Sequence, residues 1–435
     1  MRAYITKIKE TTEYIVYLPD SLRYFISNES TVELIQAIMK PMSFDELTEQ
    51  GFTFTREDYD YFNSVLSEKA LTKFDKIPNN ALSRLVINIS NACNLGCKYC
   101  YANEGQYHSS EELMSCEVAI KVMESFYSVF DHIELVQLFG GEPCLNIPVV
   151  ECICKYISSS NKNTAIGLVT NGTIMPDNLM ELIKNHNIYT TLSIDHEQIH
   201  DMVRPYKNGK GSFEKIVSNM MKLRALTGKP NQIELTYTSL HEKIGITVDD
   251  AIKSVEYIFG QIPVHLVPVI SDEPMYRLSN TDSFIDSISK YFELKRKNTT
   301  RLQHTYIQRF LYPLMNRTPS SMYCSAGQGT LSVSTNGDVY SCFYFTDDEE
   351  QKITNIFKSS NEFYNDVINA RNYYHSCSSS YIKDCEECFA NTICYNCLGI
   401  NFSETGDLYK NPEFQCDLTR KGLQRVLEEI GDDFC

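Results

Sequence analysis

Three cysteines separated by three and then two residues could carry chemistry in this chain: Cys93, Cys97 and Cys100, within Asn-Ala-Cys-Asn-Leu-Gly-Cys-Lys-Tyr-Cys. Three thiolates at this spacing can ligate three irons of a four-iron cubane from one loop. The fourth iron then has no protein ligand and can bind a small molecule through its amino and carboxylate groups. A zinc site and three unrelated thiols are the alternatives.

Most of the other cysteines lie near the C-terminus of the 435-residue chain, which has 16 cysteines in all. The N-terminus shows no signal-peptide pattern, so we expect a cytoplasmic protein with reduced thiols. Because the nine histidines are scattered, thiolate-only metal sites are favoured over mixed Cys/His sites. Four cysteines outside these clusters are expected to pack in the core without a ligand role: Cys116, Cys144, Cys152 and Cys154.

The bulk composition excludes two classes of partner. The net charge of −16 argues against nucleic acid, which needs a basic surface. No apolar run reaches the roughly 18 residues of a membrane span. A hydrophobic fraction of 43% with 22% charged residues is typical of a globular protein, and the length predicts two or three domains.

The first cysteine cluster directly follows a predicted strand in a region where strands and helices alternate. Six such strands predict a parallel sheet curled into a partial (β/α)6 barrel over residues 83–278, an α/β fold with its chemistry at the carboxyl ends of the strands. The expected strands are Arg84–Ile89, Ile133–Phe139, Ala165–Thr170, Thr190–Ile194, Ile233–Thr238 and Val264–Val269. The expected helices are Glu117–Phe130, Pro148–Ile157, Asp177–Lys184, Phe213–Leu226 and Val248–Ile258.

Residues 1–75 predict a separate winged-helix-like module. Alternating patterns predict strands at Tyr4–Lys7, Tyr14–Leu18 and Leu22–Ile26, followed by three short helices, of which the first opens with a capping box at Ser30 and the second at Ser43. Residues 279–323 are expected to form a helical connector. Residues 324–435 are rich in cysteines and loops, so we expect them to bury little apolar surface and to be held together by metal.

The Cys93 cluster, with Tyr99 as its aromatic residue, resembles the CxxxCxφC signature of the radical S-adenosylmethionine (SAM) superfamily. This resemblance implies that SAM binds the open iron and is cleaved to a 5′-deoxyadenosyl radical that abstracts hydrogen. Gly140-Gly141-Glu142-Pro143 matches the family's GGEP motif after the second barrel strand, and Ser193, Asp195 and Arg204 follow the fourth. The residues expected to bind SAM are Tyr99, Gly140, Gly141, Glu142, Ser193 and Arg204.

The C-terminal cysteines resemble the SPASM extension of radical SAM enzymes, which implies two auxiliary clusters and three [4Fe-4S] clusters in total. The expected distal ligands are Cys385, Cys388, Cys394 and Cys416. The expected proximal ligands are Cys324, Cys342 and Cys397, completed by Cys377 or left with an open iron. The series departs from the family by having two residues, where three are usual, before Cys397. Cys435 is expected to be a spare thiol, and a zinc ribbon is the alternative for this region.

The N-terminal module resembles the leader-recognition element of enzymes that mature ribosomally made peptides. Such elements capture an extended leader peptide as an added strand. The resemblance implies a maturase that installs a C–C or thioether cross-link in a precursor peptide and takes electrons from a donor such as flavodoxin or ferredoxin. Tyr237 and His241 are the candidate groups for deprotonation. The alternatives are an anaerobic sulfatase maturase-like, formylglycine-forming enzyme and a non-catalytic iron–sulfur or zinc protein; the bond type, its stereochemistry and the oligomeric state stay open.

Overall fold

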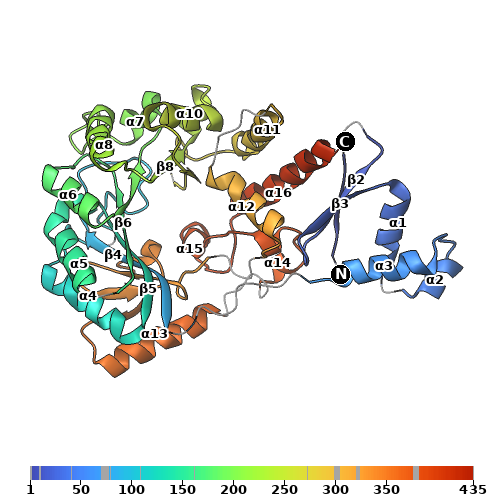
Figure 1. Ribbon diagram of the computed structural model, residues 1–435, viewed down its shortest axis with the longest axis horizontal. Helices are drawn as coiled ribbons and strands as arrows, with labels where there is room; N and C mark the ends of the chain where they lie inside the picture. Colours follow the sequence, from blue (N-terminus) through green and yellow to red (C-terminus); the bar gives the residue numbers. More distant parts are fainter. Residues whose placement is uncertain are drawn as a thin grey trace.

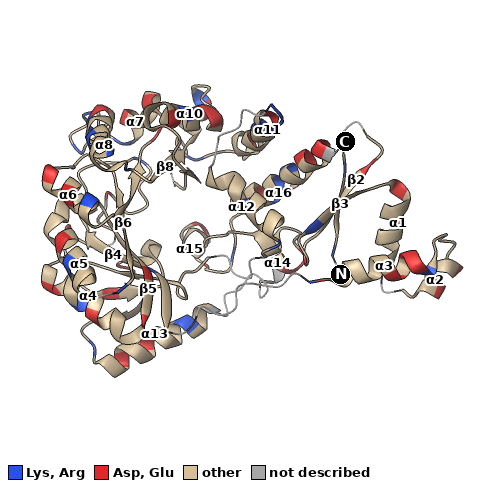
Figure 2. Cartoon of the chain, in the orientation of Figure 1, with Lys and Arg blue, Asp and Glu red and all other residues tan. Residues whose placement is uncertain are grey.

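The computed structural model shows an α/β protein with a large sheet, a small N-terminal sheet and a long C-terminal helix between them (Figure 1). Acidic and basic residues are both scattered over the outer helices (Figure 2). None of the helices within the described ranges is long and apolar enough to cross a membrane. The structure describes residues 2–8, 11–40, 42–69, 78, 80–107, 109–160, 162–271, 273–297, 304–319, 324–375 and 382–434.

The predicted partial barrel is confirmed. Its six parallel strands follow one another in the sheet in chain order, and each predicted element is present with ends shifted by at most three residues. The strands are β4 (Ala81–Ser90), β5 (His132–Gly140), β6 (Ala165–Thr170), β7 (Tyr189–Ser193), β8 (Gln232–Tyr237) and β9 (Val264–Pro268). The helices are α4 (Cys116–Val129), α5 (Ile147–Ser159), α6 (Asp177–Asn185), α7 (Glu197–Val203), α8 (Phe213–Thr227), α9 (Ser239–Lys243) and α10 (Val248–Phe259).

The C-terminal region continues the same sheet, contrary to the prediction that it buries little apolar surface. Strand β10 (Thr330–Val333) pairs in parallel with β4, and β11 (Asp338–Tyr340) and β12 (Lys352–Asn355) follow in antiparallel fashion. Leu331 and Val339 are fully buried in the main core. The prediction was wrong because these strands are short and lie among turn residues, while their burial comes from β4, far away in the sequence.

Three helices tie the barrel to the N-terminal module. The connector contains α11 (Asp282–Arg296) and α12 (Thr305–Asn316), and α16 (Glu413–Phe434) packs on both α11 and β2. Helix α13 (Ser360–His375) lies against α4 and β12. The C-terminal region is thus built into both neighbouring parts of the molecule.

The N-terminal module has the expected architecture. Its antiparallel sheet has the order β1-β2-β3, and the first and third helices pack against it in an apolar cluster. The helix start at Ser43 is confirmed, with a capping box, but the capping box at Ser30 is wrong: Asn28 caps the first helix by accepting a hydrogen bond from the Thr31 amide. Asn is as good a cap as Ser and comes earlier in the chain. The elements are β1 (Tyr4–Lys7), β2 (Tyr14–Leu18), β3 (Arg23–Ser27), α1 (Glu29–Ile38), α2 (Phe44–Glu49) and α3 (Arg56–Ser67).

Candidate active site

The three cysteines of the first cluster line one cavity at the carboxyl ends of the barrel strands. Cys93, Cys97 and Cys100 lie on the loop after β4 and all border this cavity. The loop is held at its middle, because the Gly96 amide donates to Pro205 O at 2.8 Å and the Lys98 amide donates to Val203 O at 2.8 Å. Backbone hydrogen bonds therefore fix the spacing of the thiols independently of any ligand.

Two glycines bring the end of β5 into contact with this loop. The Gly141 amide donates to Ser90 O at 2.7 Å, and the Glu142 amide donates to Ala92 O at 2.8 Å. A Cβ on Gly140 would lie 2.2 Å from Ser90 O, and one on Gly141 would lie 2.4 Å from Ala92 O. Because real Cβ atoms do not approach backbone oxygen so closely, only glycine fits at either position.

Glu142 lies behind the cavity instead of on its surface. Its carboxylate is fully buried and accepts hydrogen bonds from the Cys144 amide (2.9 Å), the Thr170 hydroxyl (2.7 Å) and the Asn171 amide (2.7 Å). Burial raises its pKa, and these hydrogen bonds oppose the rise. Thr170 and Asn171 do line the cavity, whereas Glu142 does not. The carboxylate predicted to meet SAM is thus placed to hold two lining residues.

A buried network joins three predicted residues beside the cysteines. The Tyr99 hydroxyl donates to Asp195, and Arg204 Nη1 donates to the Tyr99 hydroxyl at 3.0 Å. Asp195 also accepts from the Thr236 amide at 3.0 Å. Arg204 lines the cavity, and its Nε has no hydrogen-bond partner among the described residues. A buried, cationic donor without a partner fits the carboxylate of a bound ligand.

The structure brings most of the predicted SAM-binding residues to this one cavity. Tyr99, Gly140, Gly141, Ser193 and Arg204 all line it. Asn171 lines it too, although an Asn-Gly turn is by itself a weak sequence signal. Its place after the third barrel strand was the signal that could have identified it, because all these residues follow strand ends.

Two thiols of the first cluster, those of Cys93 and Cys97, are buried enough to favour their protonated form. Burial raises the pKa of Cys93 to about 12 and that of Cys97 to about 11, where Arg204 opposes the rise. Metal binding requires the thiolate, so iron must displace these protons. The donor set of three thiols around one cavity fits the predicted four-iron cluster.

The four predicted distal ligands also line a common cavity, of about 280 Å³. Asn411 Nδ2 donates to Cys385 Sγ at 3.2 Å, as amides do to cluster thiolates. Burial raises the pKa of Cys394 to about 12 and that of Cys416 to about 11. The four thiols are Cys385, Cys388, Cys394 and Cys416, the first on α14 (Lys383–Glu386) and the last on α16.

The three assigned proximal cysteines lie close together behind the active-site cavity. Burial raises the pKa of Cys342 to about 12, and neighbouring Cys324 adds to the rise. Cys397 has its pKa raised by burial and by both of these thiols. Cys397, which precedes α15 (Leu398–Thr405), thus joins the group despite its unusual spacing, while Cys377 and Cys435 lie outside the described residues.

Neither candidate for deprotonation reaches the cavity. The Tyr237 hydroxyl donates to Ile246 O at 2.7 Å, and its ring stacks on His241 with centroids 4.5 Å apart. Burial lowers the pKa of His241 to about 3. Both side chains are fully buried and absent from the cavity lining. They are placed to pack the outer face of the sheet.

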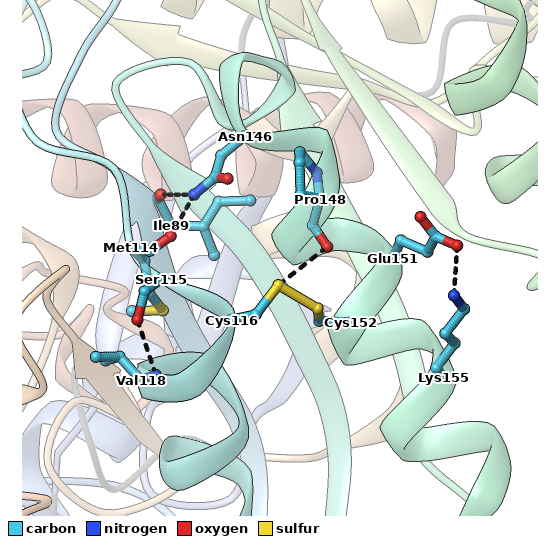
Figure 3. Close-up of a disulfide and its surroundings, with 10 residues drawn as sticks. All are labelled: Ile89, Met114, Ser115, Cys116, Val118, Asn146, Pro148, Glu151, Cys152 and Lys155. Carbon is cyan, nitrogen blue, oxygen red and sulfur yellow. Dashed lines mark hydrogen bonds and ion pairs between the residues drawn. A yellow bond between two sulfur atoms is a disulfide. The ribbon is translucent and has the colours of Figure 1, made fainter.

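Two cysteines predicted to be unpaired core residues form a disulfide. Cys116 at the start of α4 and Cys152 on α5 are bonded, with Cα atoms 6.1 Å apart (Figure 3). Nearby, Asn146 Nδ2 donates to Ile89 O and Met114 O, which anchors the start of α5 to β4. The prediction assumed reduced thiols throughout, and a spacing of 36 residues carries no sequence signal for pairing. Cys144 and Cys154 are buried and free, as expected.

Comparison with known proteins agrees with this geometry. Residues 87–258 match the radical SAM superfamily. The chain therefore contains a radical SAM domain, and the cysteine loop that lines the cavity lies within it.

Three similar proteins extend the match beyond this domain. The chain is 23% identical to the radical SAM cyclopropyl synthase TigE of Paramaledivibacter caminithermalis over 78% of this chain and 73% of TigE. It is 24% identical to a cysteine-type anaerobic sulfatase-maturating enzyme of Clostridium novyi, over 72% of this chain and 87% of that enzyme. Streptococcus suis SuiB bound to the precursor peptide SuiA shares the fold with a TM-score of 0.56 at 14% identity, over 96% and 100%. The protein is thus a radical SAM enzyme related to peptide-modifying maturases.

Proposed function

We propose that this enzyme binds the leader of a ribosomally made precursor peptide and installs an intramolecular C–C or thioether cross-link in the rest of it. The observation that carries the proposal is an open sheet edge with a groove beside it, in the same chain as a radical SAM cavity. The open edge is that of β3, which pairs with β2 and with no other strand in the described part of the chain.

The two edges of the N-terminal sheet differ in a way that favours β3 as the docking edge. The β1 edge is covered by the C-terminal region, where Arg2 Nη1 donates to Glu386 O at 2.8 Å and Tyr4 stacks on Phe389 at 4.0 Å. Strand β3 borders a groove of about 820 Å³. An extended peptide can hydrogen-bond to such a free edge while its side chains enter the groove.

The groove is lined by both apolar and polar side chains. Phe25, Tyr61 and Met315 line it, and Tyr61 and Met315 are 62% and 75% exposed. Two charged lining residues, Arg23 and Arg317, both pair with Glu68, at 2.9 and 2.5 Å. Met315 lies on α12 and Arg317 directly follows this helix, so a bound leader would contact the connector as well as the module.

The active-site residues fit the chemistry of the proposal. Cys93, Cys97 and Cys100 would hold the SAM-binding cluster, and Arg204 would pair with the carboxylate of SAM, which supplies a 5′-deoxyadenosyl radical when bound. The apolar walls contributed by Val267 and Val269 would shield this radical from water. The two C-terminal cysteine groups would hold auxiliary clusters that accept the electron released when the new bond forms. Flavodoxin or ferredoxin would supply the electron that cleaves SAM.

The similar proteins support a peptide substrate without specifying the bond. SuiB is seen bound to a precursor peptide, and TigE is named for forming a cyclopropane. The resemblance to a sulfatase-maturating enzyme keeps oxidation of a Cys or Ser as the alternative. The groove along β3 favours leader recognition, because an enzyme that reads only the residues around its target needs no second docking edge.

The test is anaerobic reconstitution with iron and sulfide, followed by reaction with SAM, dithionite and the precursor peptide encoded beside the gene. We expect about twelve irons per chain, for three four-iron clusters. We also expect 5′-deoxyadenosine and a peptide that is lighter by two hydrogen atoms, with a new bond visible by fragmentation. An unmodified peptide, or one that carries formylglycine, would refute the cross-linking proposal.

A variant pair tests the groove separately from the chemistry. Tyr61→Ala should weaken peptide binding about tenfold or more, because exposed aromatic residues are frequent anchors of interfaces. Tyr257→Ala removes a tyrosine that is even more exposed, 93% on α10, and should bind the peptide normally. Both should form 5′-deoxyadenosine without peptide at the wild-type rate. Equal peptide affinity of the two variants would remove the groove from the proposal.

A further inference from the structure

Strand β8 directs one acidic side chain into the active-site cavity. Its residues alternate between two faces, with Ile233, Leu235 and Tyr237 fully buried and Glu234 and Thr236 partly exposed. Glu234 and Thr236 line the cavity, so they point to the inside of the barrel. Tyr237, named from the sequence as a proton acceptor, points to the other face.

The surroundings of Glu234 leave its carboxylate available to a ligand. It is the one carboxylate on the described lining of the cavity, and it pairs in register with Ser193 on β7. No described side chain or amide donates a hydrogen bond to the carboxylate or forms an ion pair with it. Arg204, the one cation of the same lining, is already hydrogen-bonded to Tyr99.

A second titratable group faces Glu234 from the C-terminal region. Tyr344, on the short 3₁₀ helix Phe343–Phe345, lines the same cavity. Burial raises the pKa of Tyr344, and the charges of Cys397, Cys342 and Glu234 add to the rise. Tyr344 and Glu234 therefore lie on the same cavity, near enough for the charge of one to act on the other.

Glu234 is partly exposed on the cavity and has no described hydrogen-bond donor, so a bound ligand can supply one. In a cavity that also holds the radical-forming cysteines, the ligand that we consider is the reacting substrate. Its position allows contact with the peptide at the point where a bond forms.

We propose that Glu234 accepts the proton released when the attacking group of the peptide forms its new bond. This inference rests on the proposed function. One hydrogen atom of the peptide goes to the 5′-deoxyadenosyl radical and gives 5′-deoxyadenosine. The attacking atom, a thiol sulfur or an aromatic carbon, bonds to the resulting carbon radical and gives its proton to Glu234. The remaining electron passes to an iron–sulfur cluster held by the C-terminal cysteines, so the peptide loses two hydrogens in total.

The decisive variant is Glu234→Gln, which keeps the size of the side chain and its ability to accept a hydrogen bond but cannot take a proton. Proton-accepting groups contribute about 10²–10⁴-fold to a rate, so cross-linked peptide should form at least about 100-fold more slowly. Peptide affinity, SAM affinity and 5′-deoxyadenosine formation without peptide should be unchanged. With a peptide deuterated at the abstracted position, label should still appear in 5′-deoxyadenosine. Glu234→Asp should recover part of the product.

The matched control is Glu214→Gln, the same change on the exposed face of α8, which should behave as wild type. Loss of SAM affinity or of uncoupled 5′-deoxyadenosine in Glu234→Gln would overturn the inference, because the carboxylate would then belong to the nucleotide site. Cross-linking at the wild-type rate would overturn it as well. Failure of the wild-type enzyme to cross-link the peptide would refute the proposed function itself, and the wild-type arm alone reports that outcome.

Discussion

Replacing Gly141 by alanine tests whether the contact between β5 and the cysteine loop shapes the active site. The added Cβ would lie 2.4 Å from Ala92 O, 2.7 Å from Ala92 C and 2.9 Å from Gly105 Cα. All three are backbone atoms that cannot turn aside as a side chain could. Relief of the overlap requires the loop to move away from β5.

The cost of this movement can be worked from the contacts that it disturbs. Overpacking a tight site costs about 1–3 kcal/mol. Separation of the two segments also weakens the hydrogen bond from the Glu142 amide to Ala92 O, worth about 1 kcal/mol. The sum of about 2–4 kcal/mol corresponds to a roughly 30- to 1,000-fold smaller equilibrium constant for docking of the loop against β5. The loop carries Cys93, so iron retention should fall with it.

The assay measures iron bound per chain after anaerobic reconstitution and desalting, together with 5′-deoxyadenosine formation without peptide. Gly141→Ala should lose about four irons, those of the first cluster, and nearly all of this activity. Gly96→Ala is the control in the same loop, because its Cβ would find nothing closer than 3.5 Å. It should retain both. Wild-type iron content and activity in Gly141→Ala would refute the reasoning.

Three further predictions concern stability. Burial lowers the pKa of His200 to about 2 and that of His241 to about 3, so both are neutral in the folded protein but take up protons on unfolding at a pH below their ordinary pKa. The free energy of unfolding, measured with denaturant, should therefore fall by about 2–3 kcal/mol between about pH 7 and about pH 5.5 because of these two groups. Replacing both histidines should flatten this pH dependence. The Cys116–Cys152 bond should contribute about 3–4 kcal/mol, lost on reduction in the wild type and absent from a double serine variant under both conditions. Asn28→Ala should destabilise the N-terminal module by about 1 kcal/mol, as measured by urea unfolding, and no change would remove its role as a cap.

The barrel was readable from the sequence because its elements carry strong local patterns. Strands such as Ala165–Thr170 are short apolar runs bounded by polar turns, and helices such as Val248–Phe259 begin at clear caps. The cysteine loop was readable for another reason, since its chemistry depends on spacing along one segment. In both cases the information is local.

The parts that the sequence did not reveal depend on contacts between distant segments. The pairing of Cys116 with Cys152 follows from the docking of α4 on α5, which no local pattern reports. The inner position of Glu234 did have a local signal, because Gln-Ile-Glu-Leu-Thr-Tyr alternates and places Tyr237 on the apolar face. Its assignment required knowing which face of the strand lines the cavity. The motif identified Glu142 but gave no direction for its side chain, which accepts hydrogen bonds from Thr170 and Asn171.

The pairing of β10 with β4 has a consequence for synthesis of the protein. Arg84 pairs with Thr330, about 250 residues later in the chain. At about 5–20 residues per second, a ribosome needs roughly 10–50 s to make the intervening segment. Throughout that time the edge of β4 that later pairs with β10 has no neighbouring strand, and an unpaired apolar strand edge promotes aggregation. A nascent chain in this interval is therefore a natural client for chaperones, and a gene truncated before residue 330 should yield insoluble protein.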